Sequence, residues 1–410
     1  MNSAVQKIIT SRRDFFKLGL SGIAGVAGFP LIHKEGRNDN TDNTLDKKKF
    51  VYRILGKTGL KLPVISMGAV NTDNSSLILA ALDAGIIYFD TGHWYQRGKN
   101  EEMLGKIFKH RSRDSFIISS KLQGEHENHI AGTFNSRFDS KSFRNKFEIS
   151  LKRLQMEYVD IFLLHNAGSR EAALFDPLLS VMSQFKKEGK ARFLGVSTHV
   201  NEPDVIRAAA DSRVYDVVMT AYNFRQPHLK EMNESIDGAA KAGLGIIAMK
   251  TQAGVYWDKE RKHPINMKAA LKWAVQNENI HTAIPGITTF DQLETDLSVM
   301  VDLQLKPEEA SDLRKAPKLS ISGLYCAQCC RCRQQCLYHH DIPTFMRSYM
   351  YAYGYKNFTQ AKAILKGIRP DEIMCGVCEA CSVSCPMDFN IREKVKDIIR
   401  ILHIPDEFLG

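Results

Sequence analysis

Short apolar or β-branched runs alternate with longer segments of helical period between Phe50 and about Ala316. Such alternation is typical of repeated βα units. In the longer segments apolar residues recur three and four positions apart and share one helix face, as at Phe143, Phe147, Leu151 and Leu154. The short runs predict eight strands, at Val64–Ser66, Ile86–Phe89, Phe116–Ser119, Val159–Leu164, Arg192–Val196, Val217–Met219, Gly245–Ala248 and Thr282–Ile284.

Eight strands with intervening helices predict an α/β protein built on a closed (β/α)8 barrel, the TIM barrel. Periodicity alone leaves a doubly wound open sheet as the alternative. In a barrel of this kind the chemistry lies where the strands end at the carboxyl face. The residues that follow the predicted strands are therefore the candidates for a functional site.

Composition and charge narrow the class of protein further. The chain has 410 residues, of which 44% are apolar and 25% charged, as in ordinary soluble globular proteins. A barrel absorbs about 250 residues, so a second folded unit is expected. The formal net charge is +10, but the basic residues are spread along the chain rather than gathered in one stripe, so we predict no nucleic-acid partner.

The first 49 residues have the composition of a targeting segment and a linker. Ser11, Arg12, Arg13, Asp14, Phe15, Phe16 and Lys17 precede an apolar stretch from Leu18 to about Ile32. This segment, residues 1–32, resembles a twin-arginine (Tat) signal, which implies export of a folded protein to a periplasmic or envelope-associated location. The stretch is too short for a confident transmembrane helix, so no span is expected beyond an uncleaved signal anchor. Residues 33–49 are polar and predict a flexible linker.

Three strand ends carry unusual polar residues. The second predicted strand leads into Asp90 and Tyr95, the third into Lys121, and the fourth into His165. In this order and spacing the four residues resemble the Asp-Tyr-Lys-His tetrad of the aldo-keto reductase family. The resemblance implies a catalytic tetrad of Tyr95, Lys121, Asp90 and His165.

The chemistry of carbonyl reduction explains why these residue types are needed. Hydride reaches the carbonyl carbon while the oxygen takes a proton, which Tyr95 would donate. A tyrosine has a pKa of about 10 and donates poorly unless nearby groups stabilise its phenolate. Lys121, held by Asp90, would supply that charge, and His165 would hydrogen-bond the substrate oxygen and fix its position.

The same resemblance implies NADP or NAD as cofactor. The residues that match the family's nucleotide contacts, with some departures from its pattern, are Ser197, Thr198, Met249, Pro285, Gly286 and Gln292. Thr198 replaces the common asparagine, and Met219 stands in place of a glutamine. Gly286 and Gln292 occupy positions where NADPH-preferring members often carry lysine and arginine, so preference between NADH and NADPH stays open.

All nine cysteines lie between Cys326 and Cys385. Two runs have the spacing C-x2-C-x2-C-x3-C, which resembles bacterial ferredoxins, where the last cysteine of each run binds the cluster of the other run. This predicts two 4Fe-4S clusters, with zinc as the alternative. One cluster would be held by Cys326, Cys329, Cys332 and Cys385, and the other by Cys375, Cys378, Cys381 and Cys336. Cys330 fits no ligand position, and the long segment between the runs favours an α-helical ferredoxin.

These observations predict four segments: the signal 1–32, the linker 33–49, the barrel 50–316, and a small, mostly α-helical, ferredoxin-like domain with two clusters, 317–410. The expected function is hydride transfer between a nicotinamide cofactor and a small carbonyl or alcohol substrate, with clusters that pass electrons to or from a partner. Two alternatives stay open. The clusters could be structural or redox-sensing, or the chain could be a non-catalytic, redox-sensing regulatory subunit.

Overall fold

The computed structural model describes most of the barrel and much of the cysteine region. The described residues are 49–124, 127–128, 133–134, 138–226, 228–256, 262–314, 324–326, 329, 331–332, 334–365, 373–378 and 380–409. The predicted signal 1–32, and all of the predicted linker except Lys49, lie outside them.

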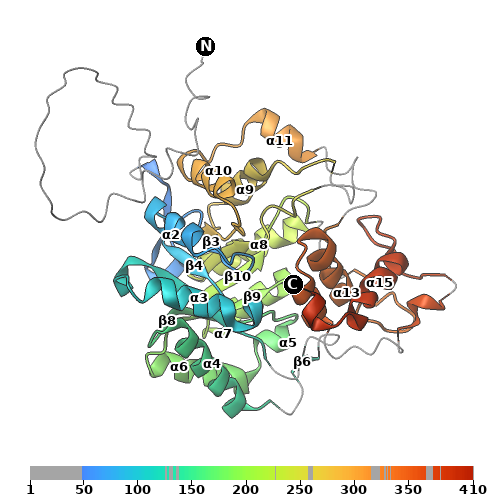
Figure 1. Ribbon diagram of the computed structural model, residues 1–410, viewed down its shortest axis with the longest axis horizontal. Helices are drawn as coiled ribbons and strands as arrows, with labels where there is room; N and C mark the ends of the chain where they lie inside the picture. Colours follow the sequence, from blue (N-terminus) through green and yellow to red (C-terminus); the bar gives the residue numbers. More distant parts are fainter. Residues whose placement is uncertain are drawn as a thin grey trace, which may run out of the picture.

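Eight parallel strands form one sheet whose order follows the chain (Figure 1). They are β3 (Met67–Gly68), β4 (Tyr88–Asp90), β5 (Ile117–Leu122), β8 (Val159–Leu164), β9 (Ala191–Thr198), β10 (Val217–Ala221), β11 (Gly245–Met249) and β12 (Thr282–Ala283). Two further parallel pairs, Ile65 with Ala283 and Gly68 with Gly286, join the first strand to the last. The sheet is thereby closed, and the (β/α)8 prediction is confirmed.

Seven predicted strands overlap the observed ones, but the first was placed too early, at Val64–Ser66 instead of Met67–Gly68. The apolar run at Val64 and Ile65 produced this error. Those residues hydrogen-bond or pair with Val51 and Ala283, and only Met67 and Gly68 pair with β4.

The helices between the strands pack their apolar faces against the sheet. Within the described residues they are α2 (Ser75–Ala84), α3 (Lys99–Phe108), α4 (Ser140–Leu154), α5 (Arg170–Ala173), α6 (Asp176–Lys187), α7 (Glu202–Ser212), α8 (Leu229–Lys241), α9 (Met267–Gln276), α10 (Phe290–Val301) and α11 (Pro307–Arg314). The face of α4 formed by Phe143, Phe147, Leu151 and Leu154 is buried, as predicted. Asp139 caps this helix by accepting hydrogen bonds from the first-turn amides of Lys141 and Ser142.

A hairpin that the sequence analysis did not predict precedes the barrel. Its strands, β1 (Tyr52–Ile54) and β2 (Lys61–Pro63), are antiparallel. Leu55 and Leu62 belong to an apolar cluster with inward residues of the strands, such as Ile161 and Val217. Filling the interior in this way makes the barrel a packed core rather than a channel.

The C-terminal region forms a second core from helices, at the right of Figure 1. Its longer elements are α13 (Ile342–Tyr349), a π-helical turn η6 (Met350–Gly354), α14 (Phe358–Ile364) and α15 (Ile391–Ile399). Three short 3₁₀ turns complete it: η8 (Met374–Gly376), η9 (Arg400–His403) and η10 (Asp406–Phe408). No strand occurs among its described residues, in agreement with the predicted helical domain.

This C-terminal region contacts loops that follow several barrel strands. Arg347 donates to the side chain of Asn166 after β8, at 3.0 Å, and Asn357 donates to Asn71 after β3, at 3.2 Å. Lys250, directly after β11, lies 3.3 Å from the hydroxyl of Tyr351. The C-terminal region therefore covers part of the carboxyl end of the barrel, where such folds carry their sites.

No helix in the described part of the chain is both long enough and apolar enough to cross a membrane.

The buried carboxylate of Asp160 joins groups from several elements, and replacing it tests how much these hydrogen bonds stabilise the barrel. Its carboxylate accepts hydrogen bonds from Arg113 at 2.6 Å, from Arg192 at 2.7 Å and from the amide of Ile118 at 2.9 Å. Asp160→Ala should lower the free energy of unfolding by about 2–4 kcal/mol, because it leaves charged groups and a buried amide without their partner. Urea denaturation followed by circular dichroism measures this loss.

The matched control is Asp211→Ala, which removes an equally short but exposed ion pair with Arg170, at 2.7 Å. Its effect should stay below about 1 kcal/mol. Equal losses in the two variants would contradict a special role for the buried carboxylate.

Candidate active site

A buried ion pair lies at the carboxyl ends of β4 and β5. Lys121 Nζ is 2.6 Å from both carboxylate oxygens of Asp90 and donates a further hydrogen bond to the carbonyl of Thr91 at 2.7 Å. Ser119 donates to Asp90 at 2.6 Å. Asp90 and Lys121 are 2% and 1% exposed, so water contributes almost nothing to their solvation. The two charges are compensated by each other and by these hydrogen bonds, which makes their burial tolerable.

Tyr95 lies beside this pair. The ammonium of Lys121 is 4.7 Å from the centre of the Tyr95 ring. Burial raises the pKa of Tyr95 well above its usual value of 10, and the Asp90 charge raises this pKa further. Burial lowers the pKa of Lys121, although Asp90 opposes that shift. The phenol therefore stays protonated at neutral pH, next to a cation that stabilises its conjugate base.

The approach of Tyr95 to Lys121 depends on a small residue and an unusual turn. A Cβ at Gly92 would lie 3.0 Å from the Lys121 side chain. After Tyr95, the residues Gln96, Arg97 and Gly98 have φ of 50°, 58° and 92°. Left-handed backbone at two non-glycine residues is unfavourable and commonly marks functional sites. Gln96 holds the turn by donating to the carbonyl of Thr72 at 3.0 Å.

His165 completes the group of four predicted catalytic residues. Its ring centre is 6.0 Å from that of Tyr95, in an edge-on arrangement. Burial, followed by the charges of Lys121, Arg347 and Lys250, holds the pKa of His165 well below its usual value of 6.5. The imidazole is therefore neutral and can offer one N–H to an oxygen bound near Tyr95. The fold brings all four residues to one place, as the strand ends predicted.

Four further residues near this site were not predicted. His199 follows β9, and its ring centre is 6.4 Å from that of His165. Tyr351, from the C-terminal region, is close enough to influence the pKa values of both Tyr95 and Lys121. The charges of Arg347 and Lys250 add to the effect of burial in lowering the pKa of His165. No sequence signal links residues 347 or 351 to the barrel.

Two predicted nucleotide contacts, Ser197 and Thr198, end β9 and are fully buried. Ser197 Oγ accepts a hydrogen bond from the amide of Asn166 at 3.0 Å, which leaves its own hydrogen available to a ligand. Thr198 instead donates to the carbonyl of Val200 at 2.8 Å. Met249 is 8% exposed and belongs to the apolar cluster inside the barrel.

The other predicted nucleotide contacts flank the loop between β12 and α10. Pro285 is buried and Gly286 is exposed. The side-chain oxygen of Gln292 accepts hydrogen bonds from the amide of Thr288 at 2.7 Å and from its hydroxyl at 3.0 Å. Thr289 caps α10 by accepting from the amide of Gln292 at 3.2 Å. Gln292 thus shapes this loop through Thr288.

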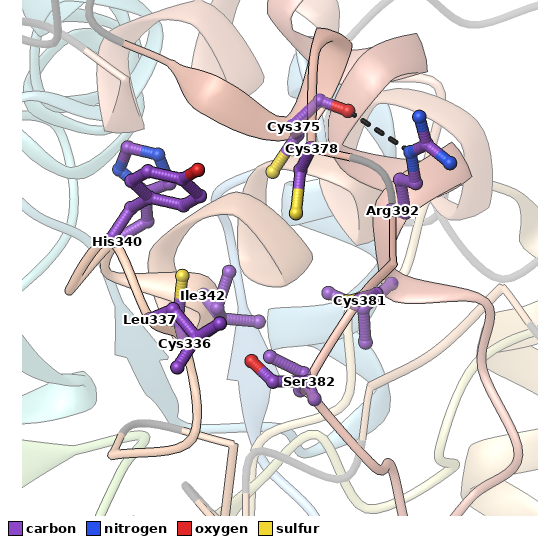
Figure 2. Close-up of a pocket in the computed structure, with 12 residues that line it drawn as sticks. Cys336, Leu337, His340, Ile342, Cys375, Cys378, Cys381, Ser382 and Arg392 are labelled. Atoms are coloured by element: carbon purple, nitrogen blue, oxygen red, sulfur yellow. Dashed lines mark hydrogen bonds between the residues drawn. The ribbon is translucent and has the colours of Figure 1, made fainter.

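A second candidate site lies in the C-terminal region. Four cysteines from the two runs, Cys336, Cys375, Cys378 and Cys381, line one small pocket. Figure 2 shows the sulfurs of Cys336, Cys375 and Cys378 pointing toward the space between them. Burial raises the pKa of Cys375 to about 11, and the neighbouring Cys336, Cys381 and Cys378 contribute to the rise.

These four are the cysteines that the resemblance to bacterial ferredoxins assigns to one cluster: three from the second run and Cys336 from the first. Burial raises the pKa of Cys329 in the first run, and the nearby Cys385 of the second run contributes to the rise. Cys330 lies outside the described residues. Among the residues that the structure describes, no three His, Cys, Asp or Glu side chains meet closely enough to hold a metal ion as they stand.

His340 is partly exposed and lies at the edge of this pocket. Its Nε2 accepts a hydrogen bond from the amide of Met374 at 3.0 Å, directly before Cys375. His340 therefore helps to position the start of the second cysteine run.

Known proteins that are similar to this chain were found by sequence and by structure. Residues 68–268 match the model of the aldo/keto reductase family. The L-glyceraldehyde 3-phosphate reductase of Escherichia coli O157:H7 is 32% identical over 329 residues, which cover 64% of this chain and 91% of that protein. The L-galactose dehydrogenase of Arabidopsis thaliana is 25% identical over 297 residues, covering 62% and 90%.

Two solved structures show the same fold at low identity. An aldo-keto reductase from Bacillus halodurans, in its holo form, has a TM-score of 0.52 at 20% identity and covers 68% of this chain and 99% of its own. One from Klebsiella pneumoniae, in complex with NADPH, has a TM-score of 0.50 at 22% identity and covers 65% and 95%.

The tetrad at the strand ends, the family match and the 32% identical relative together show that this chain belongs to the aldo/keto reductase family of oxidoreductases.

Proposed function

We propose that the barrel transfers hydride between a nicotinamide nucleotide and a small carbonyl or alcohol substrate. The observation that carries the proposal is the group of Tyr95, Lys121, Asp90 and His165, in which a protonated phenol lies beside a buried ammonium and a neutral imidazole. These are the groups that the oxygen of a carbonyl requires as its carbon is reduced.

The residues near the site are compatible with a nicotinamide nucleotide. Ser197 retains a hydrogen that it can donate, and the Gly286 loop leads into the first turn of α10, where backbone amides favour an anionic group. The related structure from Klebsiella pneumoniae contains NADPH. When bound, such a nucleotide supplies or accepts the hydride. Because Gly286 and Gln292 carry no positive charge, NADP and NAD both remain candidates.

Residues of the chain transfer the proton and stabilise the negative charge that develops on oxygen. In the reduction, Tyr95 donates its hydroxyl proton to the substrate oxygen and becomes a phenolate. Lys121 stabilises this phenolate, while Asp90 keeps the ammonium in position. In the oxidation the phenolate takes the proton back. His165 donates an N–H to the substrate oxygen and so fixes its distance from Tyr95.

Relatives support a small, polar carbonyl compound as the substrate class. One is an L-glyceraldehyde 3-phosphate reductase, and others are an L-galactose dehydrogenase and a D-threo-aldose 1-dehydrogenase. The sugar-like alcohols and aldehydes of these names contain the functional group that the tetrad is suited to convert.

We also propose that the C-terminal region holds two 4Fe-4S clusters. The support is the pocket lined by Cys336, Cys375, Cys378 and Cys381, a set of four thiols drawn from both runs. Crowded, buried thiols ionise with difficulty alone but become good ligands when cations compensate their charge. When bound, each cluster accepts or releases one electron at a time, so an electron-transfer partner would complete the system.

For location, we propose that residues 1–32 direct export by the twin-arginine route to the periplasm or envelope. Clusters are assembled in the cytoplasm, so a protein that carries them needs an export route for folded chains. Free nicotinamide nucleotide is scarce outside the cytoplasm, which favours a tightly retained cofactor.

The barrel chemistry predicts that Tyr95→Phe lowers turnover by about 10²-fold or more, because only the donated proton is lost while the ring remains. Nucleotide binding, measured by fluorescence titration, should be unchanged. Tyr52→Phe, a change in the N-terminal hairpin, is the control and should retain full turnover. Full carbonyl reduction by Tyr95→Phe would mean that another group is the acid.

The pH dependence follows from the shifted pKa values. Reduction needs Tyr95 protonated, so kcat/KM should fall as pH rises through the apparent pKa of the coupled Tyr95 and Lys121 pair. Since the pKa of His165 lies well below 6.5, no acidic limb from this residue should appear above about pH 6. Lys121→Met should move the basic limb, and an unmoved limb would exclude Lys121 as its cause.

The cysteine proposal predicts about eight iron atoms per chain in anaerobically purified protein, together with broad visible absorption that dithionite bleaches. Cys378→Ala should lower the iron content, whereas the matched change Cys330→Ala should leave it unchanged. Metal analysis that finds zinc and negligible iron would refute the cluster assignment.

The export proposal depends on the Arg12 and Arg13 pair rather than on general basicity. Replacing both with lysine keeps the charge and should hold the protein in the cytoplasm, as measured by cell fractionation and immunoblotting. Equal amounts of parent and variant in the envelope fraction would show that the twin-arginine assignment is wrong.

A further inference from the structure

Two positively charged side chains near the tetrad have no acidic partner in the part of the chain that the structure describes. Arg347, on α13, is 7% exposed, and Lys250 follows β11 and is half-buried. Within the described residues neither one forms an ion pair with a carboxylate. A buried cation without a counter-ion is costly, so this arrangement needs an explanation beyond packing.

The hydrogen bonds of Arg347 do not satisfy all the donors of its guanidinium. One Nη donates to Asn166 Oδ1 at 3.0 Å, while the buried Nε has no hydrogen-bond partner among the described residues. Asn166 is the residue directly after His165 and has a left-handed φ of 66°. Arg347 is therefore held next to the catalytic imidazole with a free, buried donor.

Lys250 approaches the same place from the barrel. Its ammonium contacts the Tyr351 hydroxyl at 3.3 Å and lies 4.8 Å from the centre of that ring and 5.8 Å from that of Tyr355. Tyr351 is four residues after Arg347, so the two side chains lie on neighbouring parts of one helical face. That face includes the π-helical turn η6, a feature often found at functional sites.

A buried histidine, His199, lies in the same region. His199 is 8% exposed, its Nδ1 has no partner among the described residues, and its ring neighbours that of His165. Burial lowers the pKa of His199, and the charges of the nearby Lys250 and Arg347 lower it further. Neutral histidines next to two unpaired cations make a region that is electropositive and rich in donors.

We propose that Arg347, assisted by Lys250, binds the carboxylate of a substrate whose carbonyl group lies between Tyr95 and His165. The inference rests on the proposed barrel function and specifies its substrate class as carbonyl compounds that also carry a carboxylate. A guanidinium forms paired, planar hydrogen bonds with a carboxylate, which would satisfy the free Nε. The C-terminal region thus contributes to substrate selection as well as holding cysteines.

The first experiment measures binding without turnover. Parent protein loaded with nucleotide is titrated with benzoate in a calorimeter, and Arg347→Met and Arg347→Lys are titrated in the same way. We expect Arg347→Met to weaken benzoate binding by about 10- to 100-fold, the usual effect of losing a charge-assisted hydrogen bond, and Arg347→Lys to weaken it less. Absence of benzoate binding by the parent, or equal binding by Arg347→Met, would overturn the proposal.

The second experiment measures selection during turnover. Reduction of 2- and 4-carboxybenzaldehyde is compared with that of the neutral 2- and 4-nitrobenzaldehydes, which have a similar size. Arg347→Met and Lys250→Met should lower kcat/KM for at least one carboxylated aldehyde by about tenfold or more, mainly through KM. The nitrobenzaldehydes lack a carboxylate, so their kcat/KM should fall much less than that of the carboxylated aldehydes, and circular dichroism spectra like the parent's should show that the variants are folded.

The control is Arg400→Met in the same region, where the side chain is 78% exposed and pairs with Asp397. It should leave both classes of aldehyde unaffected. If Arg347→Met weakens nucleotide binding and lowers turnover of both classes equally, the cation serves the cofactor and the proposal is wrong. If the parent reduces no aldehyde yet binds benzoate through Arg347, the anion site stands and the proposed hydride transfer fails.

Discussion

The buried ion pair of Lys121 and Asp90 is the interaction on which the rest of the site depends. Two charges removed from water are tolerable only when each finds partners at short range, and here Ser119 and the carbonyl of Thr91 supply the remaining bonds. This requirement fixes the register of β4 and β5, in which Asp90 pairs with Ser119. It also places the ammonium beside Tyr95, so the pair that secures the strand ends stabilises the phenolate as well.

The protonation states at the site follow from this pair and from burial. Burial, and after it the charge of Lys121, lowers the pKa of His165 and keeps it neutral, while burial and the negative Asp90 keep the Tyr95 hydroxyl protonated. The C-terminal region adds to both effects, because Tyr351 contributes to the raised pKa of Tyr95 and Arg347 to the lowered pKa of His165. Arg347 comes from that region, so the electrostatics of the tetrad are a property of the whole chain rather than of the barrel alone.

The barrel and the cysteine region are joined through tyrosines near η6. Tyr325 accepts a hydrogen bond from the amide of Val255 in the barrel and donates one to the carbonyl of Gly354 at 3.3 Å. Gly254 and Gly354 are required here because a Cβ at either would lie within 2.7 Å of the Tyr325 ring. Tyr325 directly precedes Cys326, so the segment that contacts the barrel also leads into the first cysteine run. The first cysteine run therefore begins directly beside a contact with the barrel.

The sequence by itself determined the features that follow a local period or spacing. Alternating apolar runs located seven strands, the strand ends identified Asp90, Tyr95, Lys121 and His165, and the three-residue steps of cysteines grouped the thiols that line one pocket. Only the tertiary structure revealed the approach of Arg347 to Asn166 across 181 positions, and of Tyr351 to Lys250 across 101. Such contacts arise from how two separately packed cores meet, and no periodicity along the chain encodes that. The first strand was misplaced because the apolar Val64 and Ile65 bond to the last strand at Ala283, whereas only Met67 and Gly68 pair with β4, and the apolar pattern does not distinguish the two.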